Sequence, residues 1–105
     1  MRMLVGYDGS NAAKEALMLA KKFAGSLGAT VDVVTSMTKA TEAEKDIVLQ
    51  AEKSLQYAQS IFDKAEIDCT THLLIRGLSP EEDIVKFAED NGVELIVVGV
   101  KRRSK

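Results

Sequence analysis

The stretch with the clearest chemical character is GYDGS, which joins a short apolar run to a helical pattern. It places one carboxylate, Asp8, between two glycines at the point where a strand is expected to give way to a helix. Gly6 and Gly9 carry no Cβ, so a ligand can approach the backbone closely there. Ser10 or Asn11 can cap the following helix, whose N-terminal amides can hold an anion. The segment therefore has the features of a small-molecule binding turn.

The chemistry open to Asp8 is limited by its charge, because a carboxylate repels phosphate. It can accept hydrogen bonds from hydroxyl groups such as those of ribose, or it can reach a phosphate through a divalent cation such as Mg²⁺. An aspartate at this place can equally be a turn or capping residue that meets no ligand. The sequence leaves both interpretations of Asp8 open.

The other reactive side chains form no recognisable catalytic set. His72 is the single histidine, and we expect it to be a surface or edge-strand residue because no activating partner is evident beside it. Cys69 has no second cysteine at CxxC spacing, so a packed thiol is expected. These two residues alone are too few ligands for zinc. The sequence also contains no catalytic triad, no pair of catalytic carboxylates and no Walker motif.

Several enzyme classes require motifs that the chain does not contain. A phosphorylatable receiver domain needs an acidic pair after the first strand and an aspartate after the third, but here the first supplies only Asp8 and the third ends in LLIRG. Dinucleotide-dependent enzymes carry GxGxxG after a strand, and related ATP-cleaving ligases carry SGGxDS or HIGH-type motifs. No general base or water-orienting residue is evident either, so any hydrolytic reaction would be slow.

Alternating strand and helix patterns must position these residues. Short apolar or β-branched runs predict strands at 3–7, 30–37, 68–75 and 93–99. A helix is predicted from Asn11 to Leu27, ended by Gly28, with a buried face of Ala13, Ala16, Leu17, Ala20, Phe23, Ala24 and Leu27. A longer helix follows the polar segment 38–46 and runs to about Glu66, with a buried side of Ile47, Val48, Ala51, Leu55, Ala58, Ile61, Phe62 and Ala65.

A third helix has the strongest start signal in the chain, RGLSPEED, with Ser79 at the N-cap, Pro80 at N1 and Glu82 at N3. The resulting order, β-α-β-α-β-α-β, predicts an α/β fold with a parallel sheet covered by helices on both faces. Right-handed crossovers favour a doubly wound sheet with strand order 3-2-1-4. Ligands of such sheets bind where the winding reverses, here at the carboxyl ends of strands one and four.

Composition excludes several partner classes. The net charge is −2, yet four of the fourteen Lys and Arg residues lie in the last five positions, so the body is more acidic than the total suggests. An acidic body with five scattered aromatic residues disfavours a nucleic-acid surface. No apolar run approaches the roughly 18 residues of a membrane span. A single cysteine permits no internal disulfide, which is consistent with a cytoplasmic protein.

Two segments carry a resemblance to a known family. LVGYDGSNAAKEAL resembles the opening segment of the universal stress protein family, in which an apolar strand leads into Asp-Gly-Ser and a helix. RGLSPEEDIVKFAEDNGVELIVVG resembles a later family segment. The residues that carry this second likeness are Gly77, Ile84, Ala88, Leu95, Ile96, Val97, Val98 and Gly99. The likeness covers essentially the whole chain, and the order and spacing of the pieces are more specific than either piece alone.

The resemblance implies a small cytoplasmic protein, usually a homodimer, and many family members bind ATP in the crevice described above. The family's strand-one aspartate contacts the nucleotide and matches Asp8, while Gly6 and Tyr7 match positions beside the adenosine. Ser36 is the nearest match to the family residue that packs by the adenine ring. The family's phosphate loop would contribute Gly99, Val100 and Arg102.

Two features depart from the family pattern. The phosphate loop has the form Gly-x-x-Gly, whereas position 102 is arginine, although its guanidinium can pair with phosphate directly. The sequence also stops at Lys105, before the family's later Gly-Ser, last helix and fifth strand. We therefore expect residues 1–105 to be one α/β domain of this kind without its C-terminal part, leaving strand four as an edge open to another chain. The alternative function is an interaction module that binds no nucleotide and acts through dimerisation.

Overall fold

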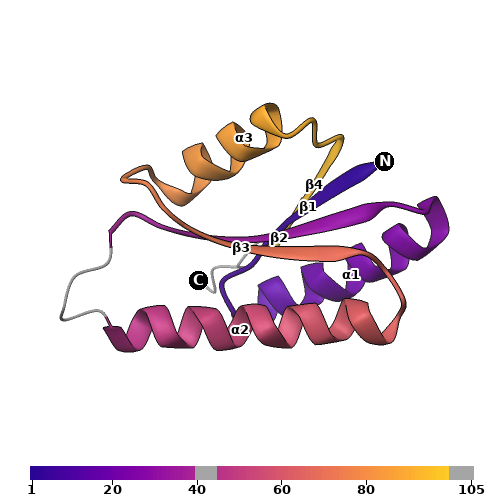
Figure 1. Ribbon diagram of the computed structural model, residues 1–105, viewed down its shortest axis with the longest axis horizontal. Helices are drawn as coiled ribbons and strands as arrows, with labels where there is room; N and C mark the ends of the chain where they lie inside the picture. The colour runs from indigo at the N-terminus through magenta and orange to yellow at the C-terminus, as the bar shows by residue number, and fades with distance from the viewer. Residues whose placement is uncertain (40–44, 100–105) are drawn as a thin grey trace, which may run out of the picture.

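The structure, a computed structural model, describes residues 1–39 and 45–99. Its elements are β1 (Arg2–Gly6), α1 (Asn11–Leu27), β2 (Thr30–Met37), α2 (Lys45–Lys64), β3 (Cys69–Ile75), α3 (Pro80–Asp90) and β4 (Leu95–Val98). The four strands form one sheet, with α1 and α2 below it and α3 above it in Figure 1. The predicted α/β architecture with helices on both faces is confirmed.

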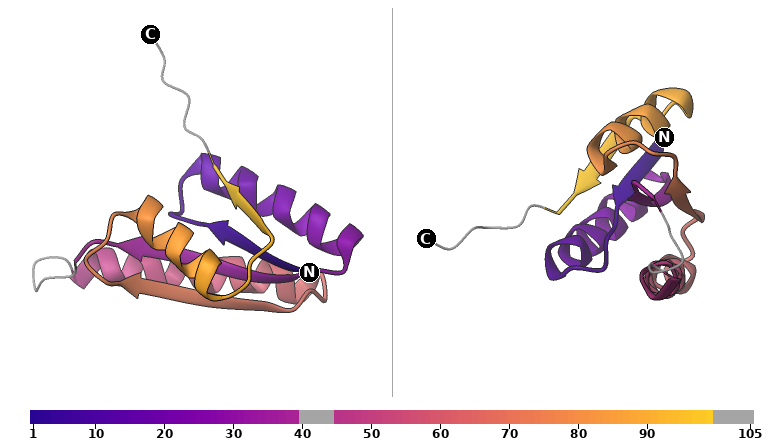
Figure 2. Two further views of the ribbon diagram at one scale, coloured as in Figure 1. Left: turned by 90° about the horizontal axis from the view of Figure 1, so that it is seen from above. Right: turned by 90° about the vertical axis from the view of Figure 1, so that its left-hand side faces the viewer.

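All strand pairs are parallel, and the order across the sheet is β3-β2-β1-β4, as predicted (Figure 2). β1 lies between β2 and β4, with Gly6 opposite Val34 on one side and Val98 on the other. β1 is shifted by one residue from the predicted range 3–7, and β4 is shorter than the predicted range 93–99. Among the described strands, β4 pairs with β1 alone, so its other edge is open.

The core is divided between the two faces of the sheet. On one face, the larger cluster packs side chains of β1 and β2 under α1 and α2. Its strand members include Met3, Val5, Val31 and Val33. On the other face, a smaller cluster brings Leu4 and Val34 against α3, through Phe87 and Ala88. Because alternate residues of β1 serve both clusters, Met3, Leu4 and Val5 are all fully buried.

The buried faces of the first two helices are narrower than predicted. On α1 the buried residues are Ala13, Ala16, Leu17, Ala20 and Ala24, whereas Phe23 and Leu27 are 42% and 51% exposed. On α2 only Leu55, Ala58 and Phe62 are buried, and Ile47 is 54% exposed. Helical periodicity identifies the apolar face, but the width of the sheet beneath it decides how much of that face is covered.

The helix ends follow the predicted signals. The Ser10 hydroxyl accepts a hydrogen bond from the Ala13 amide at 3.1 Å, and Gly28 ends α1 in the left-handed conformation. The Ser79 hydroxyl accepts from the Glu82 amide at 3.3 Å, with Pro80 at the first helical position. In residues 1–39 and 45–99, no helix combines the length and hydrophobicity that crossing a bilayer requires.

A buried carboxylate, Asp32, joins three strands and α3. Its oxygens accept from Arg2 Nε at 2.6 Å and lie 2.9 Å from His72 Nε2. Arg2 also donates to the Asn91 carbonyl beyond α3, and the His72 ring lies against Phe87 with 4.7 Å between centroids. Burial raises the pKa of Asp32, but the hydrogen bonds from Arg2 and His72 outweigh it and hold that pKa below its usual value.

We predict that replacing this carboxylate by an amide costs stability only where the carboxylate is ionised. Asp32→Asn should lower the free energy of unfolding by about 1–3 kcal/mol at pH 7, because Arg2 loses its anionic partner. A lowered folded-state pKa contributes stability above the unfolded-state pKa, about 3.9, and this contribution is lost as the pH falls through the folded-state value. Urea unfolding at pH 7 and pH 3 measures both differences.

The matched control is Asp68→Asn, because Asp68 lies on the surface before β3. It should change the free energy of unfolding little at either pH. The ionic role of Asp32 would be contradicted if the free energies of unfolding of wild type and Asp32→Asn differed as much at pH 3 as at pH 7.

Candidate functional site

A pocket of about 540 Å³ opens at the carboxyl ends of β1, β2 and β4, beneath the first turns of α3. It includes five of the residues that the sequence singled out, which lie at or just after the ends of three strands: Gly6, Tyr7, Asp8, Ser36 and Gly99. The other two predicted residues, Val100 and Arg102, lie outside the described residues. The sheet thus brings the predicted residues at the ends of β1 and β2 together with Gly99, the first residue of the predicted phosphate loop, in one pocket.

The α3 side of the pocket was not foreseen from the sequence. Pro80, Glu81, Ile84 and Val85 line it, and Ile84 also packs against the smaller core cluster. The sequence indicated a helix start here, but its position over the pocket depends on the crossover that returns the chain from β3. As a result the pocket has an apolar wall and, through Asp8 and Glu81, two carboxylates in its lining.

Asp8 combines the two interpretations that the sequence left open. Its Oδ1 accepts a hydrogen bond from the Ser10 amide at 2.9 Å, so it does shape the turn into α1. The residue is also exposed and lines the pocket, where a carboxylate can meet a ligand. The turn requires Gly9, which has φ +79° and lies close to Ser54 of α2.

Gly6 and Tyr7 are more deeply placed than Asp8. A Cβ at Gly6 would lie 3.0 Å from Ile84 Cδ1 and 3.1 Å from Val98 Cγ1, so the glycine allows these side chains to close over the strand. Tyr7 is only 3% exposed and belongs to the larger core cluster. Its carbonyl accepts from Thr35 Oγ1 at 2.5 Å, and burial raises the pKa of its phenol. Little of Tyr7 can therefore touch a ligand.

Gly99 follows β4 where the backbone passes against the first turn of α1. A Cβ at this position would lie 2.4 Å from both the carbonyl carbon and oxygen of Ala12 and 2.7 Å from the Ala13 nitrogen. These are backbone atoms, so they cannot move aside as the end of a side chain can. Glycine is needed here for close packing between strand and helix, whatever the pocket binds.

Ser36 is connected to an ion pair between the exposed Arg76 and the buried Asp83, which the sequence did not reveal. Its hydroxyl donates to Asp83 Oδ2 at 2.7 Å, and Arg76 Nε donates to Asp83 Oδ1 at 2.7 Å. Asp83 is fully buried, although it stands among the acidic residues of a first helical turn that usually faces solvent. The arginine seven residues earlier was the one available signal, but only the packing of α3 on the sheet turns this carboxylate inward.

His72 and Cys69 stay outside the pocket. His72 lies on the edge strand β3, as predicted, and its contacts are structural ones with Asp32 and Phe87. Cys69 is half-buried, and burial raises the pKa of its thiol to about 12, which is the inert thiol that was expected. Within the part of the chain that the structure describes, no three His, Cys, Asp or Glu side chains form a group that could hold a metal ion.

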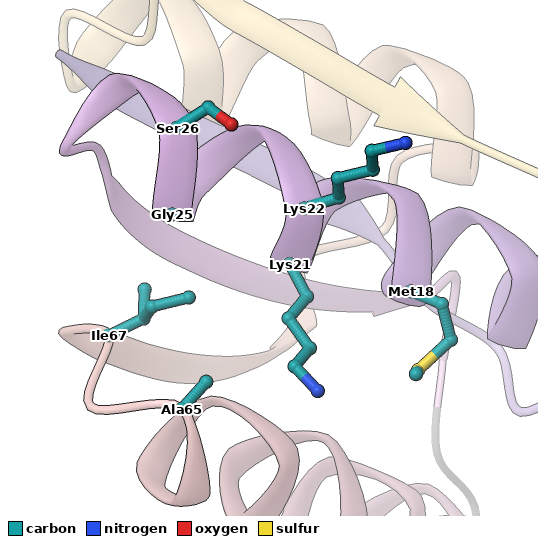
Figure 3. A pocket seen from close by; sticks show the side chains of 7 residues that line it. All are labelled: Met18, Lys21, Lys22, Gly25, Ser26, Ala65 and Ile67. Atoms are coloured by element: carbon teal, nitrogen blue, oxygen red, sulfur yellow. The ribbon is translucent and has the colours of Figure 1, made fainter.

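A second hollow, of about 450 Å³, lies between the outer side of α1 and the residues that follow α2 (Figure 3). Lys21 extends into the space above Ala65, with Met18 beside it, whereas Lys22 points away. The two ammonium groups therefore do not converge on one position. This hollow lacks the convergent polar groups that characterise small-molecule sites, so the pocket at the strand ends is the better candidate.

We predict that Gly99→Ala lowers the free energy of unfolding by about 1–3 kcal/mol, because the added methyl group overlaps the α1 backbone. Gly25→Ala is the matched control: nothing lies within 4 Å of a Cβ there, so it should stabilise α1 by about 0.5–1 kcal/mol. Urea unfolding of the two variants measures the difference. Equal stability of Gly99→Ala and wild type would show that the close approach is not required.

Comparison with known proteins places this geometry in a family. Residues 1–105 match the universal stress protein family. No curated protein sequence matches the chain significantly. Among solved structures, the universal stress protein from Archaeoglobus fulgidus is 33% identical with a TM-score of 0.89, covering 99% of this chain and 79% of that one.

Two further structures are similar. The Archaeoglobus fulgidus protein in complex with dAMP is 32% identical with a TM-score of 0.82, covering 93% of this chain and 79% of that one. A universal stress protein family member from Burkholderia pseudomallei is 24% identical with a TM-score of 0.78, covering 94% of this chain and 80% of that one. The family match over the whole chain agrees with the strand order and with the resemblance found in the sequence. The chain belongs to the universal stress protein family.

Proposed function

We propose that the protein is a cytoplasmic stress-response module that binds an adenine nucleotide, ATP, in the pocket at the carboxyl ends of β1, β2 and β4. The observation that carries this proposal is the pocket itself, whose lining unites Gly6, Asp8, Ser36 and Gly99 from the carboxyl ends of three strands. It lies where doubly wound sheets bind ligands. Its volume, about 540 Å³, is within the range of sites for small organic molecules.

The lining divides naturally between the parts of a nucleotide. Ser36, Ile84 and the exposed Val85 offer a mostly apolar wall for the base. Asp8, exposed at the turn, can accept hydrogen bonds from ribose hydroxyls. Phosphates would extend past Gly99, which lies against the first turn of α1, where the first amides have no carbonyl of their own helix to bind. Val100 and Arg102, which lie outside the described residues, remain candidates for phosphate contact from the sequence alone.

A magnesium ion would enter with the nucleotide. The two carboxylates in the lining, Asp8 and Glu81, repel bare phosphates but attract a phosphate-bound cation. Asp8 would act on the metal indirectly, within the Mg-ATP complex. The sequence carries no recognisable general-base or water-orienting motif, so hydrolysis of the bound ATP would be slow at most.

A related structure supports the ligand class. The Archaeoglobus fulgidus universal stress protein, 32% identical to this chain, has been solved in complex with dAMP. An adenine nucleotide therefore binds a protein of the same fold and family. The proposal extends that ligand class to this chain because the strand ends on which it depends are present here.

We predict that Mg-ATP raises the melting temperature of the protein by several degrees at concentrations well above Kd. Asp8→Asn should weaken ATP binding about tenfold, because a carboxylate accepts a stronger hydrogen bond from ribose than an amide does. An asparagine oxygen can still accept a hydrogen bond from the Ser10 amide, so this variant should keep the turn into α1. Thermal unfolding with and without Mg-ATP, together with calorimetric titration, measures both effects.

Asp8→Ala removes both the hydrogen bond with the Ser10 amide and the carboxylate that would meet the ligand. It removes both roles, so it should lose ATP affinity and also melt a few degrees lower without nucleotide. Asp68→Ala serves as the control and should respond to Mg-ATP as wild type does. Wild-type ATP affinity in Asp8→Asn would remove Asp8 from the site, and no ATP response in the wild type would overturn the proposed function.

A second candidate function is association with another copy of the chain through the open edge of β4. Leu19 and Phe23, one turn apart on the same flank of α1, are 47% and 42% exposed. Leu19 lines a shallow hollow with the end of β4, where Val98 is 50% exposed. An open strand edge beside exposed apolar side chains is a typical surface for pairing between chains.

We predict that the protein forms a homodimer with twice the 11.4 kDa chain mass at micromolar concentration. Leu19→Glu should shift it to the monomer, because a carboxylate would be buried in the contact. Leu49→Glu, at an equally exposed position on α2, should leave the dimer intact. Analytical ultracentrifugation of the three proteins decides the matter, and a dimer that survives Leu19→Glu would place the contact elsewhere.

A further inference from the structure

Ser36 is held by a chain of three side chains that begins outside the pocket. Arg76, after β3, pairs with the buried carboxylate of Asp83 in the first turn of α3. Asp83 Oδ2 accepts a hydrogen bond from the Ser36 hydroxyl at 2.7 Å. Ser36 lines the pocket, whereas Asp83 does not. The direction of the Ser36 hydroxyl is therefore set by a buried carboxylate and its arginine partner, neither of which lines the pocket.

The direction of this hydrogen bond limits what Ser36 can offer. A serine hydroxyl has one proton to donate and two lone pairs to accept with. The proton is used by a carboxylate, which is a strong, charge-assisted acceptor. Arg76 keeps that carboxylate paired, and the burial of Asp83 excludes water as a competing donor. Towards the pocket, Ser36 can therefore only accept a hydrogen bond.

We infer that Asp83 and Arg76 act as positioning residues that make Ser36 a selector for the amino group of adenine. This inference rests on the proposed function. Adenine carries an amino donor at its 6-position, whereas hypoxanthine and guanine carry a carbonyl acceptor there. A carbonyl facing Ser36 would bring two acceptors together and leave both without a proton. The pocket should therefore discriminate between purines at the 6-position through Ser36.

The test compares ATP with inosine triphosphate, which has a carbonyl oxygen in place of the 6-amino group. Wild type should bind ATP about tenfold more tightly than inosine triphosphate. ATP gains one hydrogen bond to Ser36, whereas the carbonyl of inosine triphosphate stays unpaired there. Ser36→Ala should bring the two Kd values close together, and Ser36→Thr, which keeps the hydroxyl, should restore the difference. Calorimetric titration in the presence of Mg²⁺ gives the ratio for each protein.

Asp83→Asn tests the positioning role itself. Its amide group can donate to Ser36 Oγ, which frees the serine proton to face a carbonyl, so the ratio should fall towards one chiefly through tighter inosine triphosphate binding. Asp90→Asn, the same change at an exposed position of α3, should keep the wild-type ratio. A purely structural role of Asp83 would weaken both nucleotides together without changing their ratio.

The outcomes separate the inference from the proposed function. If wild type binds ATP but does not distinguish it from inosine triphosphate, or if the ratio survives both Ser36→Ala and Asp83→Asn, the inference is wrong and nucleotide binding stands. If wild type binds neither nucleotide, both fall. Circular dichroism checks folding, and if Asp83→Asn does not fold, the Ser36→Ala and Ser36→Thr pair decides the result.

Discussion

β1 lies between β2 and β4 with Met3, Leu4 and Val5 fully buried, and this position constrains the whole molecule. Both faces of the strand must be covered, so α1 and α2 pack on one side and α3 on the other. Because all strands are parallel, their carboxyl ends meet at one edge of the sheet. The chain leaves β1 towards α1 at this edge, and β2 and β4 end beside it. The candidate site is a consequence of burying β1.

Two buried carboxylates join α3 to the sheet at opposite ends of the helix. Asp83 in its first turn pairs with Arg76 and Ser36, and Asp32 lies in a network with Arg2, which reaches the Asn91 carbonyl beyond its last turn. A buried charge without partners costs several kcal/mol, so each network restricts where α3 can sit. The position of α3 in turn sets one wall of the pocket. The same ion pairs therefore orient the helix and shape the site.

The elements and their order were predictable because their signals are local. Alternation in 30–37, the Ser79-Pro80 start of α3 and the glycine end of α1 each depend on neighbouring residues, and the strand order follows from chain handedness. The predicted residues Gly6, Asp8, Ser36 and Gly99 line one pocket. The burial of Phe23, Leu27 and Ile47 was predicted wrongly, because periodicity reports a face and not the extent of the surface that covers it.

The sequence by itself determined the α/β class and the turn that carries Asp8, since both depend on residues close together in the chain, and the strand order, which follows from the right-handedness of the crossovers. Only the tertiary structure decided that Asp83 is buried against Ser36, that Tyr7 belongs to the core, and that Gly99 passes within contact of α1. These facts depend on how α3 and α1 pack on the sheet. Packing joins residues tens of positions apart, and a pattern of neighbouring residues contains no record of such distances.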